Sequence, residues 1–449
     1  MNSKILNLIA GFICFSSVSG LYSCKDTTPV DTKYIKDFHV TNFLHSANML
    51  EEGKLALYVD YSTCIAEGMK TSALYVKLVP SFVEATKTFY SIKGDSVKQE
   101  IPANTYDRLL NIHEVNYANL KLAAEQIAKG NTEAALLTDG EYYNPTKAGA
   151  NPNNPYLADA FKTWMKKGHD IFIISEPYIE TNNGLQYNKK RFYFLFTDTR
   201  LKNNIYDRIA QTASLEQFPY VQIFHLSADH PNIMAEGNSS QANDLLAANI
   251  EPYGIFEIQD WTLGWKQIEK YIMGAVDEQT GNPLPNGDFV IKGLKVDRNS
   301  FGGYKITDVD VKVYDMNMAY MDYYMQKESG VKVGALGEEL PECPIFLVVD
   351  HKEFERHGMM NLYFDIMNYN NAFLIGKPNN YFKIDFFITK TENVFSKYSS
   401  MFTFDLLGHP GVTNYSVVTS VEQCLVDKDL ENQMKHSPFY TIYIKSNKY

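Results

Sequence analysis

Apolar positions follow two alternating patterns from about residue 36 to about residue 232. Short apolar runs predict buried strands, and apolar residues at helical spacing predict amphipathic helices between them. Strands that alternate with helices predict an α/β fold with a mostly parallel, Rossmann-like sheet covered on both faces. The expected strands are Lys54–Asp60, Thr86–Ile92, Ala134–Gly140, Asp170–Ser175, Arg191–Thr197 and Val221–Ser227, and the expected helices are Ser72–Ala85, Leu120–Ile127, Asp159–Lys167 and Asn203–Ala213.

The pattern changes beyond Asp288, where apolar and polar residues alternate one by one. Thr307, Val309, Val311 and Val313 mark such a strand, with one face exposed to water. Many strands and few helices predict a β-rich, antiparallel, sandwich-like domain. Its other elements are expected at Ile345–Val349, Asn361–Ile366, Tyr381–Ile388, Met401–Leu406, Tyr415–Thr419 and Tyr440–Ile444, with one helix near Val421–Met434.

A polar stretch at 236–250 suits a domain boundary, and a helix is expected after it at Trp261–Met273. The predicted organisation is therefore an α/β domain over 36–235, a linker and helix over 236–287, and a β-rich domain over 288–449.

The first residues have the features of a secretory signal. Lys4 precedes the apolar run Ile5–Val18, and small residues lead to Cys24. The ending Leu21-Tyr22-Ser23-Cys24 resembles a bacterial lipobox of the Bacteroidetes type, which implies a lipoprotein signal over 1–24 and a lipid on Cys24. Residues 25–35 are polar and suit a tether. The resemblance implies a lipid anchor in the outer membrane and leaves the periplasmic and cell-surface faces both open.

The net charge and the cysteine positions limit the kinds of ligand that the protein can bind. The net charge of −11 argues against nucleic acid, because phosphate binding needs a basic surface. Cys64, Cys343 and Cys424 lie beyond the signal and have no metal-like spacing. A disulfide between Cys343 and Cys424 and a set of buried thiols both remain open.

Two of the expected strands end in acidic residues. The first is followed by Asp60-Tyr61-Ser62-Thr63-Cys64, and another by Thr138-Asp139-Gly140-Glu141. Ligands of α/β sheets gather at the carboxyl ends of the strands, so this edge is the expected site.

These two segments resemble the von Willebrand factor A (vWA) domain, whose strands end in D-x-S-x-S and T-D-G motifs. The resemblance covers roughly residues 36–232. It implies a site for Mg²⁺ or another divalent cation held by Asp60, Ser62 and Asp139, and Mg²⁺ prefers such oxygen ligands. Cys64 replaces the second serine, and Asn116 is the oxygen donor nearest the position of the family's threonine. The alternative is that Asp60 and Asp139 bond backbone amides at the ends of loops.

The resemblance implies a binding, adhesion or assembly protein of the cell envelope rather than an enzyme. Its partner would be a protein or a glycan, and Glu141, Tyr142 and Tyr143 would form the binding surface beside the loop Asn144–Pro155. The alternative is a metal-dependent hydrolase of envelope phosphoesters or glycans, in which His169-Asp170 and His225 would assist Asp60 and Asp139.

Overall fold

The fold is taken from a computed structural model of the chain. It describes residues 33–43, 54–61, 65–66, 71–110, 117–142, 151–198, 201, 203–228, 234–237, 253–258, 289–296, 302–343, 347–349, 351–364 and 379–447, several C-terminal strands by their backbone only. The signal, Cys24, Ser62, Cys64, Asn116, Tyr143 and the helix expected at Trp261–Met273 lie outside the described residues. Among the described helices none is both long and apolar enough to cross a membrane.

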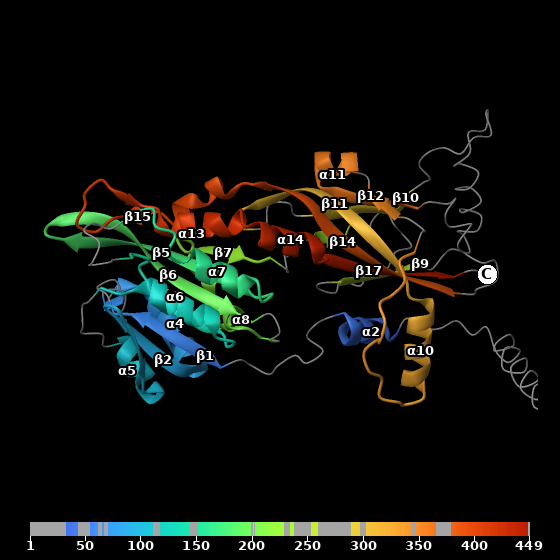
Figure 1. Cartoon of the computed structure of the whole chain (residues 1–449), viewed down its shortest axis with the longest axis horizontal. Helices are drawn as coiled ribbons and strands as arrows, with labels where there is room; N and C mark the ends of the chain where they lie inside the picture. Colours follow the sequence, from blue (N-terminus) through green and yellow to red (C-terminus); the bar gives the residue numbers. More distant parts are fainter. Residues whose placement is uncertain are drawn as a thin grey trace, which may run out of the picture.

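The α/β prediction is confirmed by a seven-stranded mixed sheet (Figure 1). β1 pairs in parallel with β2 and β4, and the remaining neighbours pair antiparallel, so β1, β2, β4 and β5 point one way. Every residue of β1 and β4 is buried, as expected for strands covered on both faces. The strand order is β3 (Ser96–Glu100), β2 (Thr86–Lys93), β1 (Leu55–Asp60), β4 (Ala134–Thr138), β6 (Leu185–Thr197), β5 (Asp170–Asn182) and β7 (Gln222–Leu226).

Helices cover both faces of this sheet because alternate residues of each strand point to opposite sides. Leu55, Leu57 and Val59 of β1 pack with α4 (Ala73–Ala85) and α8 (Ile205–Ala213). Ala56 and Tyr58 face the other cluster, which contains α6 (Leu120–Lys129) and α7 (Ala158–Met165). A short helix, α5 (Thr105–Leu110), lies beside α4.

The C-terminal part contains two four-stranded sheets, so its β-rich character is confirmed. In the first, β11 (Tyr304–Asp315), β14 (Asn379–Asn393) and β17 (Tyr440–Asn447) pair antiparallel, and β9 (Tyr253–Ile258) joins β17 in parallel. The second sheet is antiparallel and has the order β12 (Leu347–Val349), β13 (Met359–Phe364), β10 (Phe289–Val296) and β8 (Met234–Gly237). Helix α11 (His351–His357) precedes β13.

Two expected strands of this part are wrong. Tyr415–Thr419 enters helix α13 (Ser416–Leu425), because the Asn414 side chain accepts the Ser416 backbone N–H (2.9 Å) and starts a helical turn. Met401–Leu406 contains only the two-residue strand β15 (Phe404–Asp405), which pairs with β16 (Thr413–Asn414). The helix expected at Val421–Met434 is divided, and α14 (Lys428–His436) begins at its cap Asp427.

Residues between β14 and β17 return to the α/β sheet. The 3₁₀ helices η3 (Phe395–Lys397) and η4 (Ser399–Met401) and helix α13 share one hydrophobic core with α7 and the sheet. Phe224 of β7 packs on Phe395 with ring centroids 5.6 Å apart, and Ser175 donates a hydrogen bond to the Met401 carbonyl (2.8 Å). The core of the α/β sheet is thus completed by the segment between β14 and β17. Cys343 and Cys424 are buried and form no disulfide with one another.

The first described helix, near the start of the sequence, packs against the C-terminal part of the molecule. α2 (Ile35–Asn42) packs against α10 (Asn317–Glu328) of the C-terminal part, and neither helix was expected from the sequence. Phe38 lies between Tyr320 and Tyr323, and His39 is hydrogen-bonded to Tyr443 of β17. The N-terminal segment is therefore fixed to the end of the molecule away from the β5–β6 hairpin (Figure 1).

Candidate functional site

The expected edge of the sheet brings Asp60 and Thr138 together. Because β1 and β4 are parallel neighbours, their last residues end side by side. The Thr138 hydroxyl donates a hydrogen bond to Asp60 Oδ2 (2.7 Å), and it accepts one from the Gly140 backbone N–H (3.1 Å). Asp60 is fully buried. One hydroxyl thus connects the acid of the first motif to the backbone of the second.

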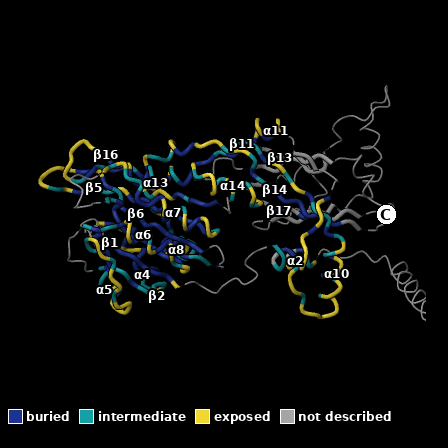
Figure 2. The backbone as a smooth tube through the Cα atoms, in the orientation of Figure 1, coloured by how far each residue is buried: buried dark blue, intermediate teal, exposed yellow. Residues whose placement is uncertain are grey.

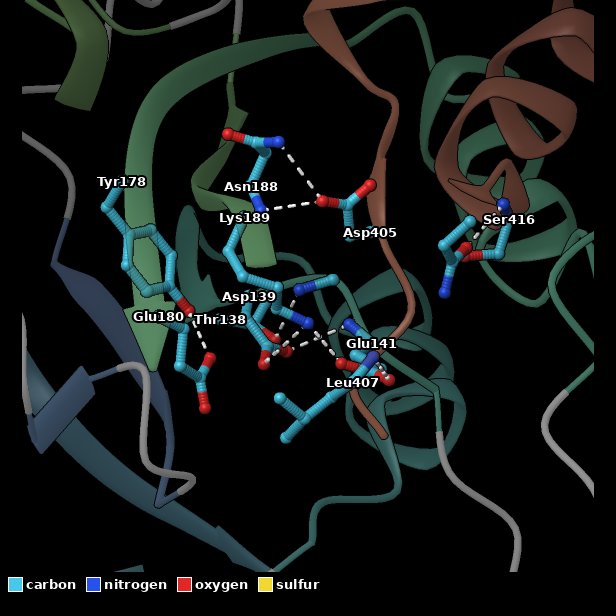
Figure 3. A network of polar contacts seen from close by, with 12 residues as sticks. Thr138, Asp139, Glu141, Tyr178, Glu180, Asn188, Lys189, Asp405, Leu407 and Ser416 are labelled. Carbon is cyan, nitrogen blue, oxygen red and sulfur yellow. Dashed lines mark hydrogen bonds and ion pairs between the residues drawn. The ribbon is translucent and has the colours of Figure 1, made fainter. Parts of the chain in front are cut away.

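The backbone makes a tight turn from Asp139 to Glu141 directly after β4 (Figure 3). Asp139 Oδ1 accepts the Glu141 backbone N–H (2.8 Å), which is an Asx turn. Gly140 between them has φ +74°, and a Cβ there would lie 2.8 Å from the ring of Phe192. Only glycine suits both the backbone angle and the close approach of that ring.

A buried lysine of strand β6 supplies the positive charge at this site. The side chain of Lys189 is wholly buried; its ammonium contacts Glu141 and lies 3.9 Å from Asp139 Oδ2 (Figure 3). The ring of Phe404 lies on its other side, with its centroid 4.9 Å from Nζ. Burial opposes the charge, but Asp139 and Glu141 outweigh it and raise the pKa of Lys189. Burial, helped by Asp139, raises the pKa of Glu141 against the pull of Lys189. The lysine of this cluster therefore stays charged, and Glu141 is a weaker acid than an exposed glutamate.

The C-terminal segment closes the site from above. The Leu407 backbone N–H donates to Glu141 Oε1 (3.1 Å). Asp405 Oδ2 accepts the backbone N–H of Asn188 (2.7 Å) and its side-chain amide (3.2 Å). Glu141 is thereby turned inward, between Lys189 and the segment that carries Leu407.

Aromatic side chains fix the loop that follows. The Tyr156 hydroxyl donates to the Gly140 carbonyl (2.7 Å), and the ring of Tyr142 stacks on Tyr156 with centroids 5.0 Å apart. Burial raises the pKa of Tyr156 well above its usual value, so its hydroxyl stays a donor. Of the expected binding surface, Glu141 and Tyr142 are thus engaged within the molecule.

A second buried ion pair lies on the same hairpin. Arg191 is two residues from Lys189, so both point to one side of β6. Its guanidinium donates to Glu176 Oε2 (2.7 Å), and the Ser72 hydroxyl donates to Glu176 Oε1 (2.5 Å). Ser72 is also the cap of α4 and accepts the Tyr75 backbone N–H (2.8 Å). This network joins the hairpin to the helix that follows β1.

The residues of the hydrolase hypothesis are not brought together. Asp170 starts β5 and is level with Thr197, at the opposite edge of the sheet from Asp139. His225 bonds Asp170 there (2.9 Å), and His169 lies 3.5 Å from Asp198. These groups are therefore separated from Asp60 and Asp139 by the length of β4.

Two of the predicted metal ligands, Asp60 and Asp139, already have partners among the described residues, and Ser62 and Asn116 lie outside those residues. Asp60 is bonded to Thr138, and Asp139 faces the Lys189 ammonium, which a metal ion would repel. In the part of the chain that the structure describes, no group of three or more His, Cys, Asp or Glu side chains is placed to hold a metal. Lys189 is a residue that the sequence prediction missed. Its signal is the alternation of Lys189 and Arg191 within a strand, where a charged pair on one side is unusual.

No family model, curated protein or solved structure matches this chain.

Proposed function

We propose that this chain is a lipid-anchored protein of the bacterial outer membrane that binds a protein or glycan partner through the free end of its β5–β6 hairpin. The anchor is Cys24, and the support for it is the signal-like sequence that precedes this residue. The hairpin is the observation on which the binding role rests.

The hairpin extends well beyond the sheet that carries it. β4 pairs with β6 only from Phe192 to Phe196, whereas β5 and β6 continue to pair with one another as far as Asn182 and Leu185. The two-residue turn Asn183-Gly184 has positive φ at both positions, which suits a tight type I′ hairpin turn.

The free end of the hairpin carries two exposed apolar side chains, one on each face, and its base is fixed. Ile179 is 62% exposed and Leu185 is 49% exposed. The base of the hairpin is held by the Arg191–Glu176 ion pair and by the bonds between Asn188 and Asp405. Exposed apolar side chains on a rigid support are typical of recognition surfaces, because little entropy is lost on binding.

A vWA-like α/β domain is the scaffold in this proposal. Its support is that Asp60 ends β1, that Thr138-Asp139-Gly140 follows in the neighbouring β4, and that Thr138 bonds Asp60. The antiparallel strand β6 beside β4 is a departure. In place of the family's metal, Lys189 neutralises Asp139 and Glu141, so the proposed binding does not need a divalent cation.

The test is photo-crosslinking in the native host cells. A benzophenone amino acid replaces Ile179 or Leu185 at the hairpin, and Val76, an equally exposed aliphatic residue of α4, is the control. We expect a discrete crosslinked product from both hairpin positions and none from Val76, with no effect of EDTA. Absence of products at the hairpin, or their loss in EDTA, would contradict the proposal.

A further inference from the structure

Helix α10 exposes a row of methionines. Met318, Met321 and Met325 are 67%, 47% and 55% exposed, and their spacing puts them on one side of the helix. Tyr320 and Tyr323 point to the other side, into the core shared with α2. Figure 2 colours part of the backbone tube of α10 as exposed. Exposed apolar side chains grouped in this way mark a contact surface.

The start of the described chain is fixed to this same helix. The Lys33 ammonium bonds Glu328 at the end of α10 (2.6 Å), and the Tyr34 hydroxyl bonds the same carboxylate (2.8 Å). The Tyr323 hydroxyl donates to Asp37 of α2 (2.9 Å). These contacts determine where the preceding residues leave the folded part of the chain.

The number of residues between Cys24 and Lys33 limits how far Cys24 can lie from the end of α10 that Lys33 contacts. Residues 24 and 33 are nine steps apart in the sequence. At no more than about 3.6 Å a residue, Cys24 lies within roughly 32 Å of Lys33 whatever the conformation between them. A lipid on Cys24 therefore keeps α10 close to the membrane surface.

We propose that the methionine face of α10 rests on the lipid surface that holds the anchor. This inference depends on the lipid of the proposed function. An apolar helix face can enter the boundary between headgroups and acyl chains, and the anchor supplies a high local concentration of that surface. Methionine adapts to such irregular surroundings because its side chain is flexible. The helix face adds a second contact to the lipid anchor.

The contact would also orient the molecule. α2 and α10 lie near one end of the long axis, and the β5–β6 hairpin extends to the other end (Figure 1). With α10 on the membrane, the hairpin lies at the far end of the long axis from this contact. The proposed recognition surface is then presented to partners beyond the membrane surface.

Methionine oxidation can test this contact with the full-length protein. The lipidated protein, in vesicles of phosphatidylethanolamine and phosphatidylglycerol, is treated with chloramine-T, a charged oxidant that stays in water. Sulfoxide at each methionine is followed by peptide mass spectrometry. The reference is the form lacking residues 1–24, mixed with the same vesicles. Leu185→Met places a reporter at the hairpin, and the buried Met316 reports whether the fold is intact.

We expect Met318, Met321 and Met325 to be oxidised severalfold more slowly in the lipidated protein than in the reference. The reporter at position 185 should react at the same rate in both, and Met316 should stay slow. Equal rates at the three methionines, with a lipid found on the Cys24 peptide, would overturn the contact of α10 and leave the anchor standing. A Cys24 peptide without lipid would overturn the anchor and the contact together.

Discussion

The Lys189 ammonium contacts the Glu141 carboxylate inside the molecule, although the two residues are 48 positions apart in the sequence. Lys189 comes from the middle of a hairpin strand, and Glu141 follows the T-D-G segment of the central strand β4. Asp139 lies on the same ammonium. Two carboxylates at the expected edge, among them the predicted metal ligand Asp139, are thus joined by a side chain of the protein.

Removal of this ammonium should destabilise the fold strongly. Lys189→Met keeps the length of the side chain and leaves Asp139 and Glu141 buried without their cation. We expect the free energy of unfolding in urea to fall by about 3–5 kcal/mol. Lys121→Met is the control, because Lys121 pairs with Glu125 at the surface (3.8 Å) and should contribute about 0–1 kcal/mol.

A second substitution shows how much of the stability lost in Lys189→Met is due to unpaired charge and how much to altered packing. Glu141→Gln in the Lys189→Met background removes one of the unpaired negative charges, so part of the lost stability should return. A Lys189→Met variant as stable as Lys121→Met would show that the buried pair does not carry the site.

Gly140→Ala should destabilise more than Gly184→Ala. Both glycines have positive φ, +74° and +77°, so alanine is strained by about 1 kcal/mol at either position. A Cβ at residue 140 also meets Phe192 at 2.8 Å, whereas nothing lies within 4 Å at residue 184. Urea unfolding of both variants measures the difference. An equal loss of unfolding free energy in the two variants would mean that the Phe192 ring can move away from the new Cβ at no cost in stability.

His39 should make stability depend on pH. Burial, with a smaller contribution from the charge of Lys383, lowers the pKa of His39 from 6.5 to about 3. As pH falls below 6.5, the unfolded chain therefore gains a proton that the folded chain excludes. Stability is complete above that pH and decreases below it, by about 2 kcal/mol near pH 5.

The matched variant for this effect is His39→Gln, which keeps a polar partner for the Tyr443 hydroxyl. Urea unfolding near pH 7 and near pH 5 should show a smaller decrease in the variant than in the wild type. The same decrease in both would assign the acid sensitivity to other groups.

The sequence predicted the α/β sheet well because its strands are continuous apolar runs. Every residue of β1 and β4 is buried, and such runs have few other solutions in a folded chain. The Asn183-Gly184 dipeptide is also a local sequence signal for the β5–β6 hairpin, since both positions have positive φ. By contrast, α10 packs tyrosines inward and methionines outward, so its apolar residues lie on both sides and show no clear period.

Only the site residues that lie at the ends of β1 and β4 could be predicted from the sequence. Asp60 and Asp139 could be placed at one edge because parallel strands end together. Lys189 and Leu407 reach Glu141 from distant parts of the chain, and no local pattern specifies such a meeting. The sequence therefore identified the acidic residues but not the Lys189 ammonium that pairs with them or the segment with Leu407 that covers them.

Calorimetric titration of Mg²⁺, Mn²⁺ and Ca²⁺ into the form lacking residues 1–24 tests most directly whether Lys189 takes the place of a metal. We predict no saturable heat for any of the three ions. Saturable binding that disappears in Asp139→Ala would show that the acids hold a metal despite Lys189, and would contradict a metal-independent site.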